Sequence, residues 1–387
     1  MTISIELFRP SFGEEESEAV KETIESKWWG LGPKTRRFEE RFADYIGVDY
    51  ALGVNSGTSA LILACQALSG SHIRSFIVPS ITFIASYFAP IYQTLGDIYL
   101  ADVDPETMLM TDETIQKTID KFKINRPIVI PVHLYGNMFK FETDNVELAS
   151  KVKVIEDCAH ACGSSVDGKK AGSLGTIGCF SFHAVKNLAC GDGGMVTTND
   201  KDLYERMKSL RWFGITKSTF ERSGEDNLKT NYGWEYDVIE RGHKMHMNDL
   251  TAAIGLVQLK KLDGHNQSRR MIARRYLEAL GGLGWIDFIG TNPGVNTSQH
   301  IFAIKTRNRN ELNVYLKEQG IATGVHYKPI YEYSFIPETM RKTFKEHCPN
   351  TESEWPKLLS LPCYPSLTEL EQEYVISRIK EFGRVKI

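Results

Sequence analysis

The chain has 387 residues, 46 Lys and Arg against 49 Asp and Glu, and a hydrophobic fraction of 42%, which is the composition of a globular protein with a large core. The formal net charge is −3 and no run of five basic residues occurs, so the usual electrostatic basis for binding nucleic acid or an anionic membrane is missing. The N-terminal residues contain no basic segment followed by an apolar stretch, and no run of 18 apolar residues occurs. We therefore expect no signal peptide, no membrane span and a cytoplasmic location.

Short apolar runs alternate with segments of helical period through the first 250 residues, which is typical of βαβ units and a mainly parallel sheet. The predicted strands are residues 51–54, 75–78, 97–101, 128–132, 152–156, 179–182 and 194–198. The predicted helices are residues 14–26, 35–45, 58–68, 111–121, 201–210, 248–280 and 368–382. The sequence thus predicts a large α/β domain over residues 1–250 and a smaller α+β domain over residues 251–387.

Two other features have open interpretations. Residues 216–241 are polar and aromatic-rich without clear periodicity, and Tyr232, Trp234 and Tyr236 alternate along them, which fits either a substrate-facing loop or a short packed strand. Cys158 and Cys162 flank His160, but no C-x-x-C pair occurs and a second close pair is missing. Small buried thiols are therefore favoured, and we predict no metal site.

Residues 55–60 join an apolar strand to a helix whose start is rich in small hydroxyl residues. The free backbone N–H groups of such a helix start suit a phosphate, although an ordinary Ser or Thr N-cap explains the same pattern. Residues 154–160 form a buried strand that ends in Glu156 and Asp157. Because strand ends in open α/β sheets point into the ligand crevice, Asp157 is placed to pair with a buried cation or to accept hydrogen bonds from nearby backbone.

Residues 178–188 run from an apolar strand into a polar turn that contains Lys186, and a glycine-rich turn follows at residues 191–194. A buried lysine suits Schiff-base formation with a carbonyl, while a lysine whose head reaches solvent is the alternative. Together, a phosphate cradle, a strand-end Asp and an interior Lys match the aldehyde, ring nitrogen and phosphate of pyridoxal 5′-phosphate (PLP).

The ordered motifs resemble the DegT/DnrJ/EryC1/StrS family of sugar aminotransferases, within the aspartate-aminotransferase-like, fold type I PLP enzymes. The resemblance covers nearly the whole chain and is specific because many separated positions agree. It rests on residues 9–11, 55–60, 79–83, 133–136, 156–163, 181–194, 248–255, 326–327 and 361–362.

The resemblance implies catalytic roles for three residues. Lys186 matches the lysine that is bonded to the cofactor, and Asp157 matches the acid that holds the pyridine nitrogen. His160 falls where the family has Gln or His close to the ring hydroxyl. Some relatives have His in place of the lysine and eliminate water; Lys186 stands in the matching register, which disfavours that branch, and His183 is interpreted as a core histidine or one behind the site.

The resemblance also implies the remaining cofactor contacts. Phe83 falls where an aromatic ring stacks on the pyridine. Gly57, Thr58 and Ser181 match the phosphate-binding positions of the same subunit. Lys244 sits where family members reach the phosphate of the neighbouring subunit, which implies a homodimer with shared active sites.

The implied reaction moves an amino group from L-glutamate to a nucleotide-linked keto-deoxysugar, with C-4 slightly favoured over C-3, in amino-sugar biosynthesis for surface glycans such as lipopolysaccharide O-antigen. The alternatives are a cyclitol (inosose) aminotransferase and a non-catalytic regulatory protein that retains the fold. A turn packed under the cleft is a second interpretation of residues 326–327. The implied substrate contacts are Trp29, Gly30, Tyr135, His326 and Tyr327.

Overall fold

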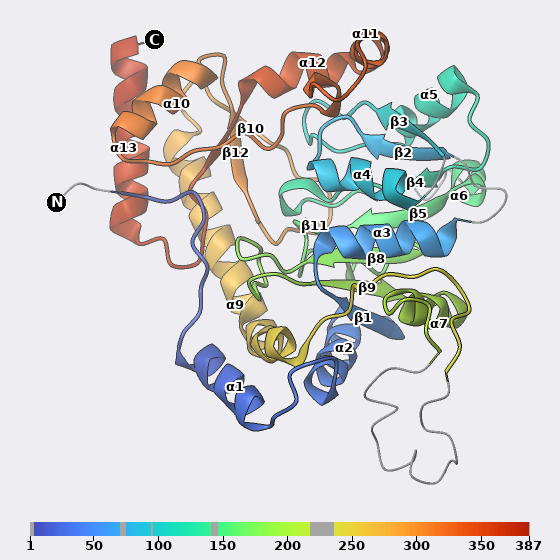
Figure 1. Ribbon diagram of the computed structural model, residues 1–387. Coiled ribbons are helices and arrows are strands. Elements are labelled where there is room, and N and C mark those ends of the chain that lie inside the picture. The colour runs from blue at the N-terminus through green and yellow to red at the C-terminus, as the bar shows by residue number, and fades with distance from the viewer. Residues whose placement is uncertain (1–3, 70–74, 94–95, 141–145, 217–235, 387) are drawn as a thin grey trace.

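The computed structural model describes residues 4–69, 75–93, 96–140, 146–216 and 236–386. The strands of its central sheet are, in spatial order, β1 (Tyr50–Val54), β9 (Gly194–Thr198), β8 (Ile177–Ser181), β5 (Lys153–Asp157), β4 (Ile128–Val129), β2 (Ser75–Pro79) and β3 (Asp97–Ala101) (Figure 1). All neighbouring pairs from β8 to β3 are parallel, and β9 is antiparallel to both β1 and β8. This mainly parallel sheet confirms the predicted fold class.

The five helices predicted in the first 210 residues occur close to their predicted positions. The helices of the first 210 residues are α1 (Glu14–Glu25), α2 (Pro33–Ile46), α3 (Gly57–Leu68), α4 (Ile84–Gln93), α5 (Asp112–Phe122), α6 (Val146–Lys151) and α7 (Lys201–Leu210). Local signals set their ends: α2 begins at a proline and ends at Gly47 with φ 84°, and the side chain of Thr111 caps α5. The sequence did not predict α4, in which Pro90 interrupts the helical pattern, and it did not predict the short helix α6. The strand predicted at residues 128–132 ends at Val129, two residues before Pro131, which has no N–H to donate.

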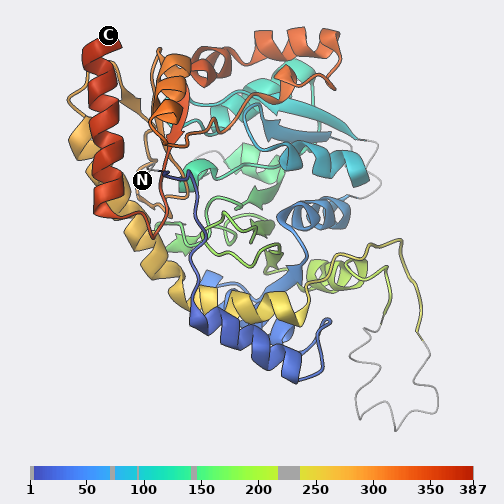
Figure 2. The same cartoon turned by 60° about the vertical axis from the view of Figure 1, so that its left-hand side comes forward.

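The later part of the chain forms a second layer around the long helix α9 (Asp249–Leu280). The start of α9 packs against α1 and α2, and its end lies beside α13 (Glu369–Lys386), as both views show (Figure 1, Figure 2). The other helices of this part are α10 (Arg309–Glu318), α11 (Glu338–His347) and α12 (Pro349–Glu354). One small antiparallel sheet contains β10 (Asp287–Phe288), β12 (Phe302–Lys305) and β13 (Leu358–Leu361), and another contains β11 (Val295–Asn296), β6 (Ser165–Val166) and β7 (Lys169–Lys170).

The apolar cores join distant segments of the chain. A core around the later half of α9 includes Ile5 together with Tyr276, Leu361 and Phe382. The core of the central sheet includes Tyr331 and other residues between 330 and 348. The boundary at residue 250 therefore stays a prediction, and α9 runs continuously across it.

Residues 217–235, with Tyr232 and Trp234, lie outside the described residues. Tyr236, at the edge of that segment, is exposed. Within the described ranges, no helix is both long enough and apolar enough to span a bilayer.

Candidate active site

Most of the predicted site residues meet at the carboxyl edge of the central sheet. Parallel strands end at the same edge, so Asp157 at the end of β5 and Ser181 at the end of β8 lie near the start of α3, which follows β1. A cavity of about 330 Å³ opens there. Its wall includes Ser56, Gly57, Thr58, Phe83, Asp157, His160, Ser181, Lys186, His326 and Tyr327.

Lys186 lies in the turn after β8, where its backbone N–H donates to the carbonyl of His183. Its side chain lines the cavity, and burial lowers the pKa of Lys186 to about 8, while the nearby Asp157 carboxylate opposes this shift. A lysine with this pKa is partly neutral near pH 7 to 8. Lys186 is therefore suited to act as a nucleophile toward a carbonyl or as a base.

Asp157 is 5% exposed and faces the same cavity. One oxygen, Oδ2, accepts a hydrogen bond from Ser86 Oγ at 2.7 Å, and Oδ1 accepts one from the backbone N–H of Ala159 at 3.1 Å. Burial raises the pKa of Asp157, and these two donors and the Lys186 amine oppose that shift. A cationic ring nitrogen in the cavity would give this buried carboxylate a positively charged partner.

The residues predicted to bind phosphate lie where α3 and β8 approach each other closely. A Cβ atom on Gly57 would lie 2.6 Å from Cβ of Ser181, so only glycine fits at this position. The side chain of Ser56 caps α3 by accepting from the N–H of Ser59 at 3.0 Å, and Gly57 and Thr58, ahead of that residue, line the cavity. The N-cap and the anion-site interpretations are thus compatible, because the helix start with its positive dipole end borders the cavity.

His160 is buried among aromatic side chains. Its Nε2 lies 3.0 Å from the hydroxyl of Tyr327, and its ring centroid lies 4.4 Å from that of His300. Burial, with a smaller contribution from Lys186, holds the pKa of His160 well below its ordinary value. Its Nδ1 is buried and has no hydrogen-bond partner among the described residues, so this nitrogen is free to meet a polar atom of a ligand.

The predicted aromatic and small-domain contacts divide into two groups. Phe83 is 55% exposed at the cavity wall, with its ring centroid 5.8 Å from that of Tyr327, and His326 lies in the same wall. Trp29, Gly30 and Tyr135 are not part of the wall that the described residues form. Trp29 is 55% exposed, whereas Tyr135 is buried and donates from its hydroxyl to the carbonyl of His326.

Lys244 is exposed, and its Nζ lies 5.8 Å from the ring centroid of Trp212, outside the wall of the cavity in its own subunit. Its contribution to a neighbouring subunit stays a prediction.

Several residues of the site were missed by sequence reasoning. Ser86 and Thr82 bond to one another and Ser86 to Asp157, and His300 packs on His160. His183, which the sequence placed in the core or behind the site, is exposed and lines the cavity. Ser86 lies in the first turn of α4, a helix that the sequence did not predict, so helical spacing from Phe83 could not identify it.

The residues of the cavity fit PLP. Gly57 and Thr58 at the start of α3 and Ser181 beside them line the cavity where a helix N-terminus suits a phosphate, Asp157 offers a buried carboxylate for the ring nitrogen, and Lys186 offers a partly neutral amine for the aldehyde. The free Nδ1 of His160 adds a polar partner that the described residues leave unused.

A second cavity of about 320 Å³ between α2 and α7 is lined by charged side chains such as Arg36 and Glu205, and the predicted site residues lie elsewhere.

The chain is similar to known proteins over nearly its whole length. The model of the DegT/DnrJ/EryC1/StrS aminotransferase family matches residues 10–380. The uncharacterized protein MJ1066 of Methanocaldococcus jannaschii is 34% identical over 97% of this chain and 96% of its own length. Spr1654 from Streptococcus pneumoniae, solved in its PMP form, is 26% identical with a TM-score of 0.85 over 98% of this chain and 99% of its own. PseC of Helicobacter pylori, an aminotransferase involved in the biosynthesis of pseudoaminic acid, is 25% identical with a TM-score of 0.84 over 99% of this chain and 100% of its own.

Proposed function

Because the chain belongs to the DegT/DnrJ/EryC1/StrS aminotransferase family, we propose that it transfers an amino group from L-glutamate to a nucleotide-linked keto-deoxysugar. The protein is an aminotransferase and its cofactor is PLP. The observation that carries the proposal is the buried amine of Lys186 in one cavity with the buried carboxylate of Asp157 and the start of α3.

Each residue of the cavity has a role that its surroundings support. When bound, PLP supplies an aldehyde for amines and a ring that takes up an electron pair from the donor α-carbon. Asp157 keeps a ring nitrogen protonated, and Gly57, Thr58 and Ser181 hold the phosphate. The low pKa of Lys186 lets its Nζ take a proton from the donor α-carbon and return it to the acceptor. His160 and Phe83 orient the ring from its hydroxyl and its face.

The proposed active unit is a homodimer with two shared sites. Lys244 is exposed and lies outside its own cavity wall, as a residue that serves a neighbouring subunit must. Trp29 and Gly30 also lie outside that wall, and we propose that they contact the sugar nucleotide where it crosses the dimer cleft.

We propose His326, Tyr327 and Tyr135 as further substrate contacts, with Tyr135 acting through the His326 carbonyl that it binds. The proposed pathway is amino-sugar biosynthesis for surface glycans in the cytoplasm, with amination at C-4 slightly favoured over C-3. The similarity to PseC, which is involved in pseudoaminic acid biosynthesis, supports the amino-sugar part of this proposal.

The test is to incubate the purified protein with PLP, L-glutamate and a panel of nucleotide-linked 3-keto and 4-keto 6-deoxysugars, and to follow 2-oxoglutarate and product mass. A gain of one amine on a panel member supports the proposal and identifies the nucleotide and the carbon. If glutamate changes the absorbance of bound PLP but no sugar is aminated, the acceptor is a cyclitol ketone or another sugar. A protein that binds no PLP contradicts the assignment as an enzyme.

A further inference from the structure

Next to Asp157 on β5 lies a second buried carboxylate, Glu156, which is 1% exposed. Successive side chains of a strand point to opposite faces, so Glu156 faces away from the side on which Asp157 meets the cavity. Glu156 is not part of the cavity wall that the described residues form. Its function must therefore be exerted through its neighbours.

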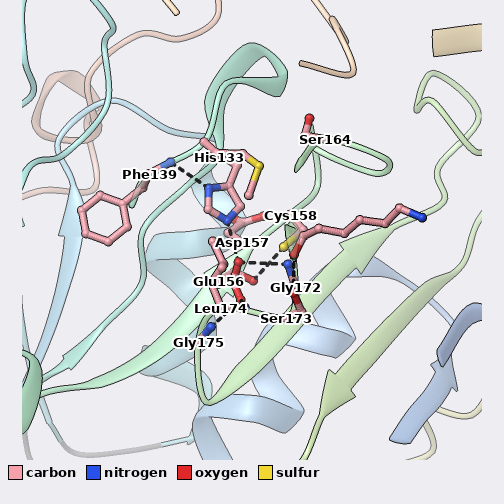
Figure 3. A network of polar contacts seen from close by, with 12 residues as sticks. His133, Phe139, Glu156, Asp157, Cys158, Ser164, Gly172, Ser173, Leu174 and Gly175 are labelled. Atoms are coloured by element: carbon pink, nitrogen blue, oxygen red, sulfur yellow. Dashed lines mark hydrogen bonds and ion pairs between the residues drawn. The ribbon is translucent and has the colours of Figure 1, made fainter. Parts of the chain in front are cut away.

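Glu156 accepts four hydrogen bonds (Figure 3). The backbone N–H groups of Leu174 and Gly175 donate to Oε1 at 2.7 and 2.6 Å, and the N–H of Gly172 donates to Oε2 at 2.9 Å. The fourth donor is Nε2 of His133, 2.9 Å from Oε2. A carboxylate with four donors is fully satisfied, so its buried negative charge is stabilised.

The bonding of His133 fixes which of its nitrogens carries the proton. Nδ1 accepts the backbone N–H of Phe139 at 3.1 Å, so the proton sits on Nε2 and is donated to Glu156. The main chain of His133 also holds Asp157: its N–H donates to the Asp157 carbonyl at 3.0 Å, while the Asp157 N–H donates to the carbonyl of Pro131 at 2.9 Å. His133 therefore binds both carboxylate residues of β5, one by its side chain and one by its backbone.

The turn that Glu156 holds leads into the strand that carries the other half of the site. Residues 172–175 precede β8, which pairs with β5 in a register that places Cys179 opposite Asp157. The strand ends at Ser181, five residues before Lys186. This turn is closely packed, since a Cβ atom on Gly172, at φ 85°, would lie 2.4 Å from the ring of Phe180. Glu156 thus joins three segments: residues 131–133, which lie beside Asp157, the strand β5 itself, and residues 172–175, which lead into β8.

We propose that Glu156 and His133 are a positioning pair that fixes Asp157 and Lys186 relative to one another. The proposal rests on the assignment of Asp157 to the ring nitrogen of PLP. Both residues act through hydrogen bonds to the backbone and contact neither substrate nor cofactor. Cys158 brings a third possible metal ligand within 4.8 Å of the pair, but burial raises the pKa of its thiol well above the ordinary value, and its Sγ lies 3.7 Å from the carbonyl of Glu156. The polar groups of Glu156 and His133 are satisfied by hydrogen bonds within the protein. We therefore interpret the cluster as a hydrogen-bonded link between chain segments and not as a metal site.

The experiment measures PLP affinity and the pH titration of the absorbance of bound PLP in matched variants. Glu156→Gln replaces an acceptor oxygen by an N–H₂ group that faces donors. His133→Gln keeps one donor and one acceptor, whereas His133→Phe keeps neither. The control is Asp102→Asn, because Asp102 is a buried carboxylate that accepts from Thr351 Oγ1 and from the backbone N–H groups of Val103, Asn350 and Thr351, away from the cavity wall.

We expect Glu156→Gln and His133→Phe to weaken PLP binding about tenfold or more and to displace the pH midpoint of the PLP absorbance, with partial recovery in His133→Gln. Asp102→Asn should lower the thermal midpoint without moving that titration. If Glu156→Gln and both His133 variants titrate as the wild type does while losing as much thermal stability as Asp102→Asn, the pair is only structural and the proposal is overturned. Should Glu156→Gln not fold, the two His133 variants decide alone.

Asp157→Asn, measured in parallel, tests the assignment of Asp157 to the ring nitrogen of PLP independently of the positioning proposal. If Asp157→Asn leaves the titration unchanged, the role of Asp157 at the ring nitrogen is wrong. If Asp157→Asn moves the titration but the Glu156 and His133 variants do not, only the positioning proposal fails.

Discussion

The end of β5 presents two neighbouring carboxylates with opposite surroundings. Glu156 accepts four hydrogen bonds on a closed side of the strand, whereas Asp157 accepts two and faces an open cavity. Burial raises the pKa of Asp157, because the two donors do not offset the loss of water. Hydrogen bonds from the protein satisfy the Glu156 carboxylate, whereas the Asp157 carboxylate can bind a cationic ligand in the cavity. Glu156 therefore supports the local structure, and Asp157 is available for the reaction.

The largest expected effect comes from Lys186→Met, which removes the reacting amine from the cavity that Asp157 faces. We expect turnover to fall by about four orders of magnitude or more. The apoprotein should become more stable at pH 7, by an amount on the order of 1–3 kcal/mol, because burial has lowered the pKa of Lys186 to about 8 from 10.5 and the folded state is penalised for holding the charged amine. Steady-state assays and urea unfolding of the apoprotein measure the two quantities. A stabilised apoprotein that still turns over at the wild-type rate would remove Lys186 from the mechanism.

The second prediction compares the two carboxylates directly in the apoprotein. Glu156→Gln should lower the free energy of unfolding by about 2–4 kcal/mol, since the new amide N–H₂ faces backbone donors and His133. Asp157→Asn should change it by less than about 1 kcal/mol, because the amide still accepts one of the two bonds and a buried charge is removed. Chemical denaturation of both variants at pH 7 is the measurement, and equal losses would contradict the contrast.

The third prediction concerns pH. The neutral fraction of Lys186 rises with pH until the pKa of about 8 is passed. The rate at which the apoprotein captures PLP should therefore rise about tenfold per pH unit below pH 8 and level off above it. Stopped-flow absorbance on apoprotein checks this, with Lys186→Met as the blank. A rate that keeps rising toward pH 10.5, the ordinary value for lysine, would show that the amine is solvated.

The smallest expected effect is that of Ser86→Ala. The hydroxyl donates to Oδ2 of Asp157 and lowers the pKa of that carboxyl, so its loss raises this pKa. We expect kcat to fall roughly three- to tenfold, and the acid limb of the kcat profile to move to higher pH. Thr82→Val is the matched control, because the Thr82 hydroxyl bonds to Ser86, 2.9 Å away, and only indirectly affects Asp157. If the two variants have the same profile, the Ser86 bond has no separate role.

Local patterns predicted much of this arrangement. The order of buried strands and the position of Asp157 at a strand end placed it in a cavity with Lys186, because parallel strands share an edge. The helix α4 could not be predicted, since Pro90 lies within it and its contacts, made mainly with α3, arise from the tertiary fold.

The hydrogen-bonded link around Glu156 also lay beyond sequence reasoning. His133 and Glu156 are 23 residues apart and meet because the segment of residues 131–133 runs beside β5. Three of the four donors to Glu156 are backbone N–H groups, which every residue except proline carries, so nothing in the sequence marks them. Similarly, His300 meets His160 only through the tertiary fold.

The membership of the two cores has a consequence for synthesis on the ribosome. Ile5 belongs to the core that Phe382 completes, and Tyr331 and Phe344 belong to the core of the central sheet. A nascent chain of 250 residues therefore lacks residues of both cores. In such a chain the side chain of Ile5 has no contact with α13, which is synthesised last. We expect the two parts to gain protease resistance in one step, late in translation, and a fragment of residues 1–250 expressed alone to aggregate through the apolar surface that residues 330–348 cover in the whole protein.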